Sequence, residues 1–170
     1  MTLMARLVTR FAALEDTLNA LDAVAGDGDH GTTMLRGLRA AADAPDPVVA
    51  FRTAAGGASG SLFAQVLAAL VAHQGGEPLP AALTRAATRI AAIGQAKPGD
   101  RTMLDALLPA AAAPDTQAAA IAAREGAEAT RAMPARRGRA RHVEGAGLGH
   151  VDAGAMSVAE MLAVVAGETQ

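Results

Sequence analysis

Apolar residues recur along the first part of the chain at steps of three and four, the period of an amphipathic α-helix. This first stripe predicts a helix over residues 2–22 with Thr2 as its N-cap, and consists of Leu3, Leu7, Phe11, Leu14, Leu18 and Leu21. Similar runs, separated by glycine, proline and aspartate, predict seven more helices. These cover residues 32–42, 48–55 after an Asp46 cap, 61–73, 80–93, a stretch from an Asp100 cap through Ala113, one from the Pro114-Asp115 break to about Met133, and 154–166. Short connections favour antiparallel neighbours, so the pattern predicts an all-α, eight-helix bundle or barrel.

Composition agrees with this fold class. The chain is very rich in alanine and has three phenylalanines but no tryptophan or tyrosine, which favours helices over strands. Its 170 residues predict one domain, residues 1–170, with a core of leucine, valine, methionine and alanine.

Charge and cysteine content exclude several classes of function. The formal net charge of −2 gives no general attraction to nucleic acid or to an anionic membrane, and the absence of cysteine excludes disulfides and thiolate chemistry. No apolar run approaches the ~20 uncharged residues that span a bilayer. We therefore expect a cytoplasmic protein without a nucleic-acid or membrane partner.

Three aspartates stand close together between the first two expected helices. Asp22, Asp27 and Asp29 lie within eight residues, and the two glycines between them permit positive-φ turns that fold the loop back on Asp22. Converging carboxylates repel one another unless a cation lies among them, and hard oxygen ligands suit Mg²⁺ or Ca²⁺. An ordinary solvated loop is the alternative. An EF-hand is excluded, because a leucine stands where its last glutamate ligand would be.

The residues directly after these aspartates open the second expected helix. The first amides of a helix lack partners and carry the positive end of its dipole, so they attract phosphate. Here they belong to His30, Gly31, Thr32 and Thr33, whose hydroxyls add donors. The alternatives are N-capping by the threonines and a solvent-exposed loop histidine.

A second glycine-rich helix start, Gly56-Gly57-Ala58-Ser59-Gly60, also fits a phosphate, although a plain helix break explains it equally. The chain contains no Walker A sequence, no protein-kinase glycine-rich loop and no strand-borne dinucleotide fingerprint. A nucleotide would therefore be bound on a helical scaffold.

The segment 134–151 has no hydrophobic period and is long for a loop in a compact domain, which points to function or disorder. A basic cluster lies in and before it: Arg131, Arg136, Arg137, Arg139 and Arg141. Most members of such a cluster form a solvated face, and it lacks the aromatic residues that stack on bases. One arginine folded over a phosphate is the functional alternative.

Five blocks of the chain resemble, in the same order, the L subunit or L domain of the dihydroxyacetone kinase family. The blocks are LDAVAGDGDHGTTMLRG, GGASGSLF, AKPGDRTMLDALLPA, GRAR and GHVDAGAMS. The resemblance implies an antiparallel eight-helix barrel that binds a nucleotide, ADP or ATP, at one open end. It also implies that Asp22, Asp27 and Asp29 hold two Mg²⁺ ions against the diphosphate, and that Arg139 joins them in the catalytic centre by binding phosphate.

The resemblance assigns the other nucleotide contacts to loops along the whole chain. Those on the phosphate side are His30, Gly31, Thr32, Thr33, Ala58 and Ser59. Those around the adenine are Gly94 and Met103, and those that close the site are Asp152, Ala153 and Gly154. Considered alone, Gly94 is equally a helix C-cap, Met103 a core residue and Asp152 the cap of the last helix.

The chain departs from the family pattern in places. Thr33 stands where asparagine is usual, Ala153 replaces a proline, and Ala140-Arg141-His142 replaces Ala-Ser-Tyr. These changes affect the closing loop and the partner surface, not the metal ligands.

In this family the sugar is held by a separate K subunit or domain, so the resemblance implies a K-type partner. The phosphate donor is either ATP or a phosphohistidine protein that recharges bound ADP. The chain is therefore expected to act in phosphoryl transfer, or alternatively as an Mg-ADP-binding regulatory module without its own turnover.

Overall fold

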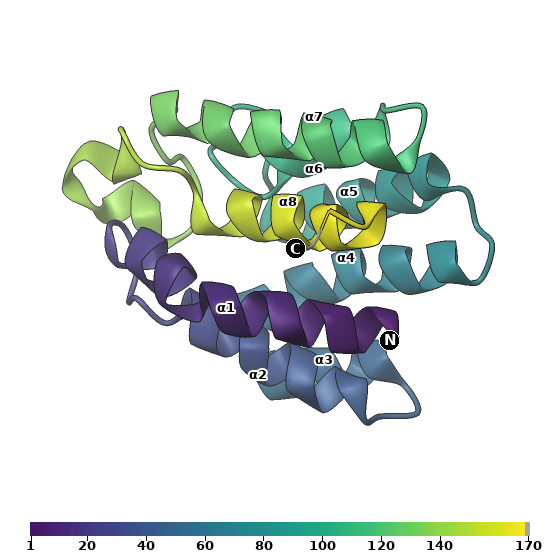
Figure 1. The fold of residues 1–170 in the computed structure, drawn as a ribbon. Coiled ribbons are helices and arrows are strands. Elements are labelled where there is room, and N and C mark those ends of the chain that lie inside the picture. Colours follow the sequence, from purple (N-terminus) through teal and green to yellow (C-terminus); the bar gives the residue numbers. More distant parts are fainter. Residues whose placement is uncertain (169–170) are drawn as a thin grey trace.

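The computed structural model describes residues 1–168 and consists of eight α-helices joined by loops and three short 3₁₀ turns (Figure 1). The helices are α1 (Leu3–Ala23), α2 (His30–Ala42), α3 (Pro47–Ala55), α4 (Gly57–Gln74), α5 (Leu79–Gly94), α6 (Leu104–Ala111), α7 (Thr116–Ala129) and α8 (Ala153–Ala166). The 3₁₀ turns are η1 (Thr130–Ala132), η2 (Arg139–His142) and η3 (Glu144–Gly147). The described part of the chain contains no strand, which confirms the predicted all-α class.

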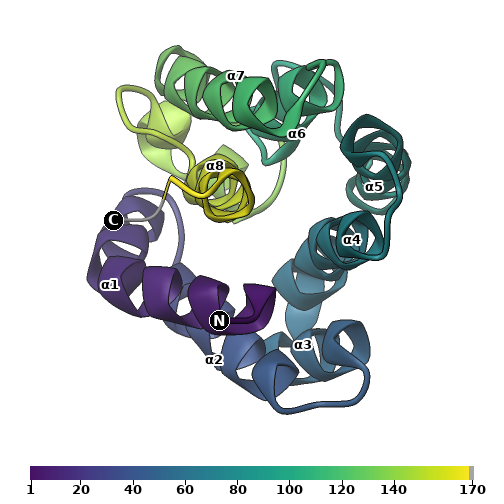
Figure 2. The same cartoon turned by 45° about the vertical axis from the view of Figure 1, so that its right-hand side comes forward.

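The helices follow one another up and down around a closed ring. Each helix packs against its neighbours in the sequence, and α8 returns to pack against α1, with further contacts to α6 (Figure 2). This closure gives every helix two neighbours, so each amphipathic stripe is covered. The arrangement is the antiparallel eight-helix barrel that the sequence predicted.

The interior is filled by aliphatic residues and by the phenylalanines, because the chain has no larger aromatic residue. Phe11 and Phe51 are fully buried, together with leucines from most helices. Small residues bring helices into close contact. A Cβ atom on Gly31 would lie 2.2 Å from the carbonyl oxygen of Glu15 in α1, and one on Gly126 would lie 2.2 Å from that of Asp105 in α6. These two glycines therefore fix the α1–α2 and α6–α7 contacts.

Side-chain caps begin the helices at several predicted positions. The Thr2 hydroxyl accepts a hydrogen bond from the amide of Ala5, and the Asp46 carboxylate accepts those of Val48 and Val49, with Pro47 as the first helical residue. Asp115 caps α7 in the same way. Each cap satisfies an amide that has no partner inside its own helix.

Three predicted helix starts were wrong. α2 begins at His30, two residues early, and α4 begins at Gly57 rather than residue 61, because the glycines of that break enter the helix. Asp100 does not cap α6, which begins at Leu104. The Asp105 carboxylate instead accepts the amides of Gly99 and Thr102 and so closes the preceding loop on itself.

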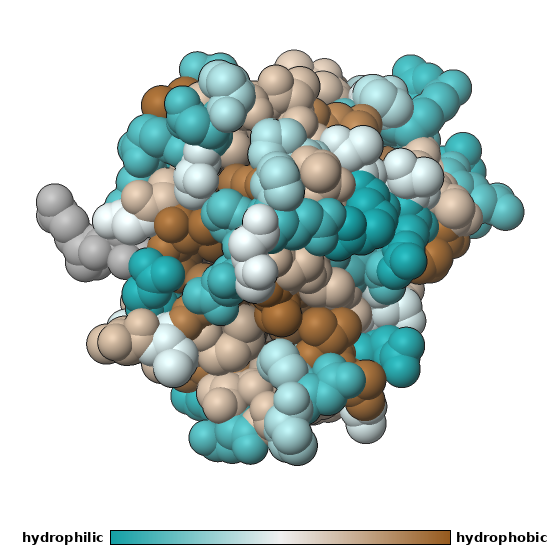
Figure 3. All heavy atoms as spheres, turned by 90° about the vertical axis from the view of Figure 1, so that its right-hand side faces the viewer, coloured by the Kyte–Doolittle hydropathy of each residue, from teal (hydrophilic) through white to brown (hydrophobic). Residues whose placement is uncertain are grey.

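The up-and-down order gathers alternate connections at each end of the barrel. One end carries the α1–α2, α3–α4 and α5–α6 loops and the long α7–α8 segment (Figure 1). At the opposite end, hydrophilic residues lie around the rim and apolar ones show between them (Figure 3). Among residues 1–168, no helix combines the length and hydropathy that a membrane crossing requires.

Candidate nucleotide and metal site

A cavity of about 610 Å³ opens at the end where the four loops meet. Every one of those loops contributes to its wall, and so do residues of α2, α4 and α5. Of the residues that the sequence singled out for metal or nucleotide binding, all but Gly31 and Thr32 line this cavity. The fold thus brings together side chains that lie up to 132 positions apart, from Asp22 to Gly154.

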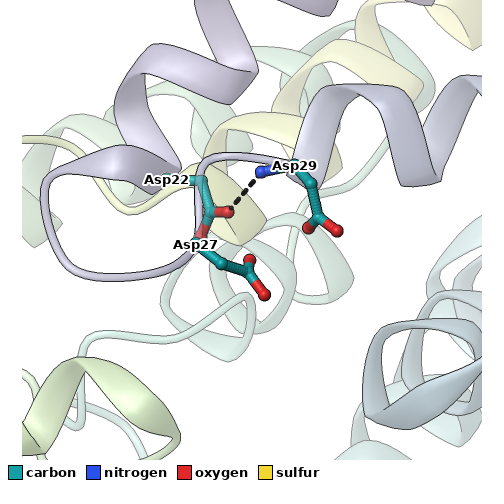
Figure 4. Close-up of side chains that lie close together, drawn as sticks. All are labelled: Asp22, Asp27 and Asp29. Carbon is teal, nitrogen blue, oxygen red and sulfur yellow. Dashed lines mark hydrogen bonds between the residues drawn. The ribbon is translucent and has the colours of Figure 1, made fainter.

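Three carboxylates converge at the α1–α2 loop. Asp22, Asp27 and Asp29 each offer an oxygen atom, and these atoms all lie within 4.8 Å of one another. Figure 4 shows the carboxylates pointing to the same side of the loop. Such a set of hard, anionic oxygen donors fits Mg²⁺ or Ca²⁺.

The loop is shaped by the first of these aspartates. Oδ2 of Asp22 accepts hydrogen bonds from the amides of Gly28 (2.9 Å) and Asp29 (3.1 Å), which folds the chain back onto the end of α1 (Figure 4). Gly28 has a φ of 77°, as expected from the sequence. Gly26 does not have positive φ; it is required because a Cβ there would lie 2.3 Å from Oδ1 of Asp22.

Two of the three carboxylates have pKa values shifted in opposite directions by their surroundings. Arg139 reaches the cluster from η2 and forms an ion pair with Asp27, and this hydrogen bond lowers the pKa of Asp27. The pKa of Asp29 is raised, first by desolvation and then by the adjacent carboxylate of Asp27. Asp27 and Asp29 therefore differ in their surroundings, one lying against an arginine and the other being more desolvated.

The residues at the start of α2 do not all face the cavity. His30 is buried, not exposed: its Nε2 lies 2.8 Å from Oγ of Ser157 in α8, and burial lowers the pKa of the imidazole. Thr32 faces α1, where its amide donates to Asn19 and its hydroxyl to Glu15. Gly31 packs against the α1 backbone.

Gly31 and Thr32 do not line the cavity, because they face α1, and their expected role at the phosphate remains a prediction. His30 and Thr33 do line the cavity. No local pattern indicates that the imidazole of His30 is partnered by a serine 127 positions away.

The second glycine-rich start lies on the neighbouring wall. Gly56 and Gly57 have φ values of 69° and 59°, and this turn places Ala58 and Ser59 at the first turn of α4, facing the cavity. No side chain caps this helix. Its first amides therefore suit an anion in the cavity.

The remaining wall is apolar. Gly94 and Met103 lie there, together with the side chains of Leu62, Phe63 and Ile90. Gly154 extends this wall, since a Cβ on it would lie 3.7 Å from both Met103 and Phe63. A cavity that is charged at one end and apolar at the other suits a ligand with a polyphosphate and a flat ring.

Arg101 holds the long α7–α8 segment, and the sequence analysis missed it. Its Nη2 donates to the carbonyl oxygens of Gly147 (3.0 Å) and His150 (2.9 Å), and its side chain is only 3% exposed. Arg101 also has a φ of 59°, which a non-glycine residue rarely adopts. Nothing in the local sequence separates this buried arginine from the exposed arginines elsewhere in the chain.

The base of the same segment is held from the α5–α6 loop. The Asp100 carboxylate accepts from Nε of Arg137 (3.1 Å), and the Asp100 carbonyl accepts the amide of Arg136 (3.1 Å). Farther out, only the Arg139 ion pair joins η2 to the α1–α2 loop by a side chain among the described residues. The segment is therefore anchored at its base beside the cavity, while most arginines of the basic cluster are exposed, as the sequence predicted: Arg131, Arg136, Arg139 and Arg141.

Asp152 caps α8 and lies beside Arg101. Its Oδ2 accepts the amide of Ala155 (2.9 Å), and Oδ1 lies 3.8 Å from Nη1 of Arg101. Burial raises the pKa of Asp152 to about 6. The neutral and charged forms of this cap are therefore both populated near that pH.

The raised pKa of Asp152 predicts a pH dependence of stability. Between pH 4 and 6 the folded protein binds more protons at this residue than the unfolded chain does, so the free energy of unfolding falls as pH rises. Asp152→Asn keeps a capping oxygen but does not titrate. We expect the stability of the wild type, relative to this variant, to fall by about 2 kcal/mol over that range. Urea unfolding at pH 4, 5 and 6 measures the difference, and parallel curves would contradict it.

Comparison with known proteins identifies the family of this chain. A family model described as the DAK2 domain matches residues 24–167. L-erythrulose 1-kinase of Mycolicibacterium smegmatis is 40% identical over 179 residues, covering 87% of this chain and 31% of the relative. Human triokinase/FMN cyclase is 34% identical over 192 residues, covering 94% of this chain and 33% of the relative.

Solved structures give the same result. The dihydroxyacetone kinase from C. freundii in complex with AMP-PNP and Mg²⁺ superimposes with a TM-score of 0.72 at 28% identity, over 98% of this chain and 33% of that chain. The chain thus spans about a third of the length of these relatives. The family match, the shared fold and the sequence identity to several kinases show that the chain belongs to the DAK2 domain family, the nucleotide-binding part of the dihydroxyacetone kinase family.

Proposed function

We propose that the chain is the phosphoryl-transfer component of a dihydroxyacetone-type kinase. It holds ATP or ADP with two Mg²⁺ ions and passes phosphate to a small ketose bound on a separate K-type domain or subunit. The observation that carries this proposal is the convergence of three carboxylates and Arg139 at the charged end of a cavity whose other end is apolar. The AMP-PNP and Mg²⁺ bound in the C. freundii relative support it.

The residues present fit the metal. Asp22 uses Oδ2 for the loop amides, which leaves Oδ1 for an ion, while Asp27 and Asp29 are partly open to the cavity. When bound, Mg²⁺ neutralises charge that spreads over the transferred phosphoryl group. Three carboxylates and a diphosphate of about −3 exceed the +4 of two ions, so a further cation is needed at the phosphates. Arg139 supplies it by leaving Asp27 for phosphate oxygens.

The other residues orient the nucleotide and exclude water. The α4 start with Ala58 and Ser59 receives a phosphate, the wall around Gly94 and Met103 receives the base, and the segment held by Arg101 covers the opening. We assign no general base to this chain. The attacking hydroxyl, and any group that takes its proton, come with the sugar on the partner.

Binding is the first test. Calorimetry of nucleotide-free protein with Mg-ADP or Mg-ATP is expected to give a saturable signal that disappears when EDTA removes the metal. The absence of a signal with both nucleotides would overturn the site assignment.

Transfer is the second test, and it separates the donors. The chain is mixed with a dihydroxyacetone-type K subunit and dihydroxyacetone or erythrulose, and sugar phosphate is measured with ATP or with a phosphohistidine protein. We expect transfer from ATP, because relatives of this chain are named kinases and one bound a triphosphate analogue. Transfer only from the protein donor would instead show that ADP stays bound to the chain and is rephosphorylated by that protein.

A regulatory module is the second candidate. The same cavity would hold Mg-ADP permanently, and the chain would act by contacting another protein. Tight nucleotide binding without transfer from either donor, across several K partners, would favour this function over the kinase role.

A further inference from the structure

Four arginines line the cavity, and three of them lie beside a carboxylate. Arg139 pairs with Asp27, Arg137 with Asp100, and Arg101 lies 3.8 Å from Asp152. The fourth, Arg36, has no carboxylate within 4.0 Å of its guanidinium nitrogens in the described part of the chain. An uncompensated cation in a cavity favours an anionic ligand group.

The side chain of Arg36 crosses from α2 to the end of α3. Its Nε donates to the carbonyl of Ala54 (2.8 Å) and its Nη2 to that of Ala55 (3.1 Å), directly before the Gly56-Gly57 turn. The guanidinium therefore occupies orphan carbonyls at the C-terminus of α3 and fixes the turn that starts α4. Among residues 1–168, Nη1 has no acceptor, so two N–H groups remain for a ligand.

The position on α2 places this charge near the metal cluster. Asp29, Thr33 and Arg36 follow at steps of four and three, so they share one helical face, and all three line the cavity. Nη2 of Arg36 lies 3.5 Å from the Thr33 hydroxyl, one turn closer to the aspartates. Helical side chains lean toward the N-terminus of their helix, which directs the guanidinium to the phosphate end.

We propose that Arg36 is a second cation for the polyphosphate, acting from the α2–α3 wall while Arg139 acts from the α7–α8 segment. Nη1 donates to phosphate oxygens, and the same side chain holds the α3–α4 turn that presents Ala58 and Ser59. This inference rests on the proposed function, since it names a residue of the same site.

Three variants test it in calorimetry of ATP, ADP and adenosine with Mg²⁺. Arg36→Gln removes the charge, Arg36→Lys keeps a charge without the fork that reaches both carbonyls, and Arg39→Gln is the matched control. Arg39 is exposed on the same helix and lies beside Thr9 and Asp43, outside the cavity. Losing a charge-assisted hydrogen bond predicts a loss of about 10- to 100-fold in ATP affinity for Arg36→Gln. We expect adenosine affinity to stay within about threefold, and Arg36→Lys to recover part of the ATP affinity.

The outcomes separate the charge from the support of the turn. Equal losses for ATP and adenosine, unchanged ATP affinity in Arg36→Gln, or an Arg36→Lys variant as weak as Arg36→Gln would each overturn the assignment. Loss of the phosphate contact and loss of the support for the α3–α4 turn can both lower the melting temperature. Thermal stability is therefore recorded only to show that each variant is folded. If the wild type binds no Mg-nucleotide, the proposed function itself fails, whereas wild-type binding with an unaffected Arg36→Gln fails this inference alone.

Discussion

Asp27→Ala is expected to abolish Mg²⁺-dependent nucleotide binding, with a loss in affinity above about 100-fold. Replacement of groups that merely orient metal ligands typically costs 10- to 100-fold, so removal of a ligand costs more. The fold is expected to persist, because the Asp27 side chain is half exposed and its one ion pair among residues 1–168 is with Arg139. Calorimetry with Mg-ADP and circular dichroism measure the two effects.

Asp16→Ala is the control for this variant. Asp16 is exposed on the outside of α1 and far from the cavity lining, so its loss changes the net charge equally without touching the cluster. Retained Mg-ADP binding in Asp27→Ala would show that the carboxylates are not the metal ligands. Asp22→Ala is less informative, since Asp22 also holds the amides of Gly28 and Asp29.

Arg101→Ala is expected to release the α7–α8 segment and to lower the free energy of unfolding by about 2 to 4 kcal/mol. The variant loses two charge-assisted hydrogen bonds and leaves the carbonyls of Gly147 and His150 without their donor. Urea unfolding measures the stability. Limited trypsin digestion measures the release, because the segment itself carries cleavage sites at Arg136, Arg137, Arg139 and Arg141.

Arg52→Ala serves as the matched control, since this exposed arginine of α3 has no side-chain hydrogen bond among the described residues. It is expected to unfold and to be digested as the wild type is. Equal digestion of Arg101→Ala and wild type would mean that the segment is ordered by its other contacts, such as that of Arg137 with Asp100. Weaker Mg-ADP binding is also expected in Arg101→Ala, because Arg139 is carried by the released segment.

The expected effects of Asp27→Ala and Arg101→Ala differ because the two segments concerned are held in place by different kinds of hydrogen bonds. The α1–α2 loop is ordered by short-range bonds, from Asp22 to amides six and seven residues later. The α7–α8 segment is ordered by bonds across 46 and 49 positions. Losing Asp27 is therefore expected to remove a metal ligand and leave the loop in place, whereas losing Arg101 is expected to displace the segment that brings Arg139 to the carboxylate cluster.

Helix positions were largely readable from the sequence because they depend on local terms. The period of apolar residues and the caps at Thr2, Asp46 and Asp115 specify where helices begin. The exceptions occur where tertiary contacts override local signals. The sequence predicts Asp100 to be a helix cap, but its carboxylate accepts a hydrogen bond from Arg137. The glycines before Gly60 predict a helix break, but α4 already begins at Gly57.

The sequence allowed residues of the candidate site to be predicted where several of them lie close together in one loop. Asp22, Asp27 and Asp29 stand in one loop, and their convergence follows from two glycines between them. The roles assigned to them remain predictions. The sequence does not show which residues at the start of α2 face α1 and which face the cavity. The first turn of a helix presents its residues in several directions, and the packing of α1 against it decides between them. Thr32 is hydrogen-bonded to α1, whereas Thr33 lines the cavity.

The sequence by itself determined the fold class, the order of the helices and the carboxylate cluster, since these depend on spacing along the chain. The family resemblance singled out Arg139, but only the tertiary structure decided which other arginines lie at the cavity. Arg36 and Arg101 look alike in sequence, yet one reaches the end of α3 and the other is buried under the closing segment. The physical reason is that a long charged side chain takes its role from the carbonyls and carboxylates within its reach, and those belong to distant parts of the chain.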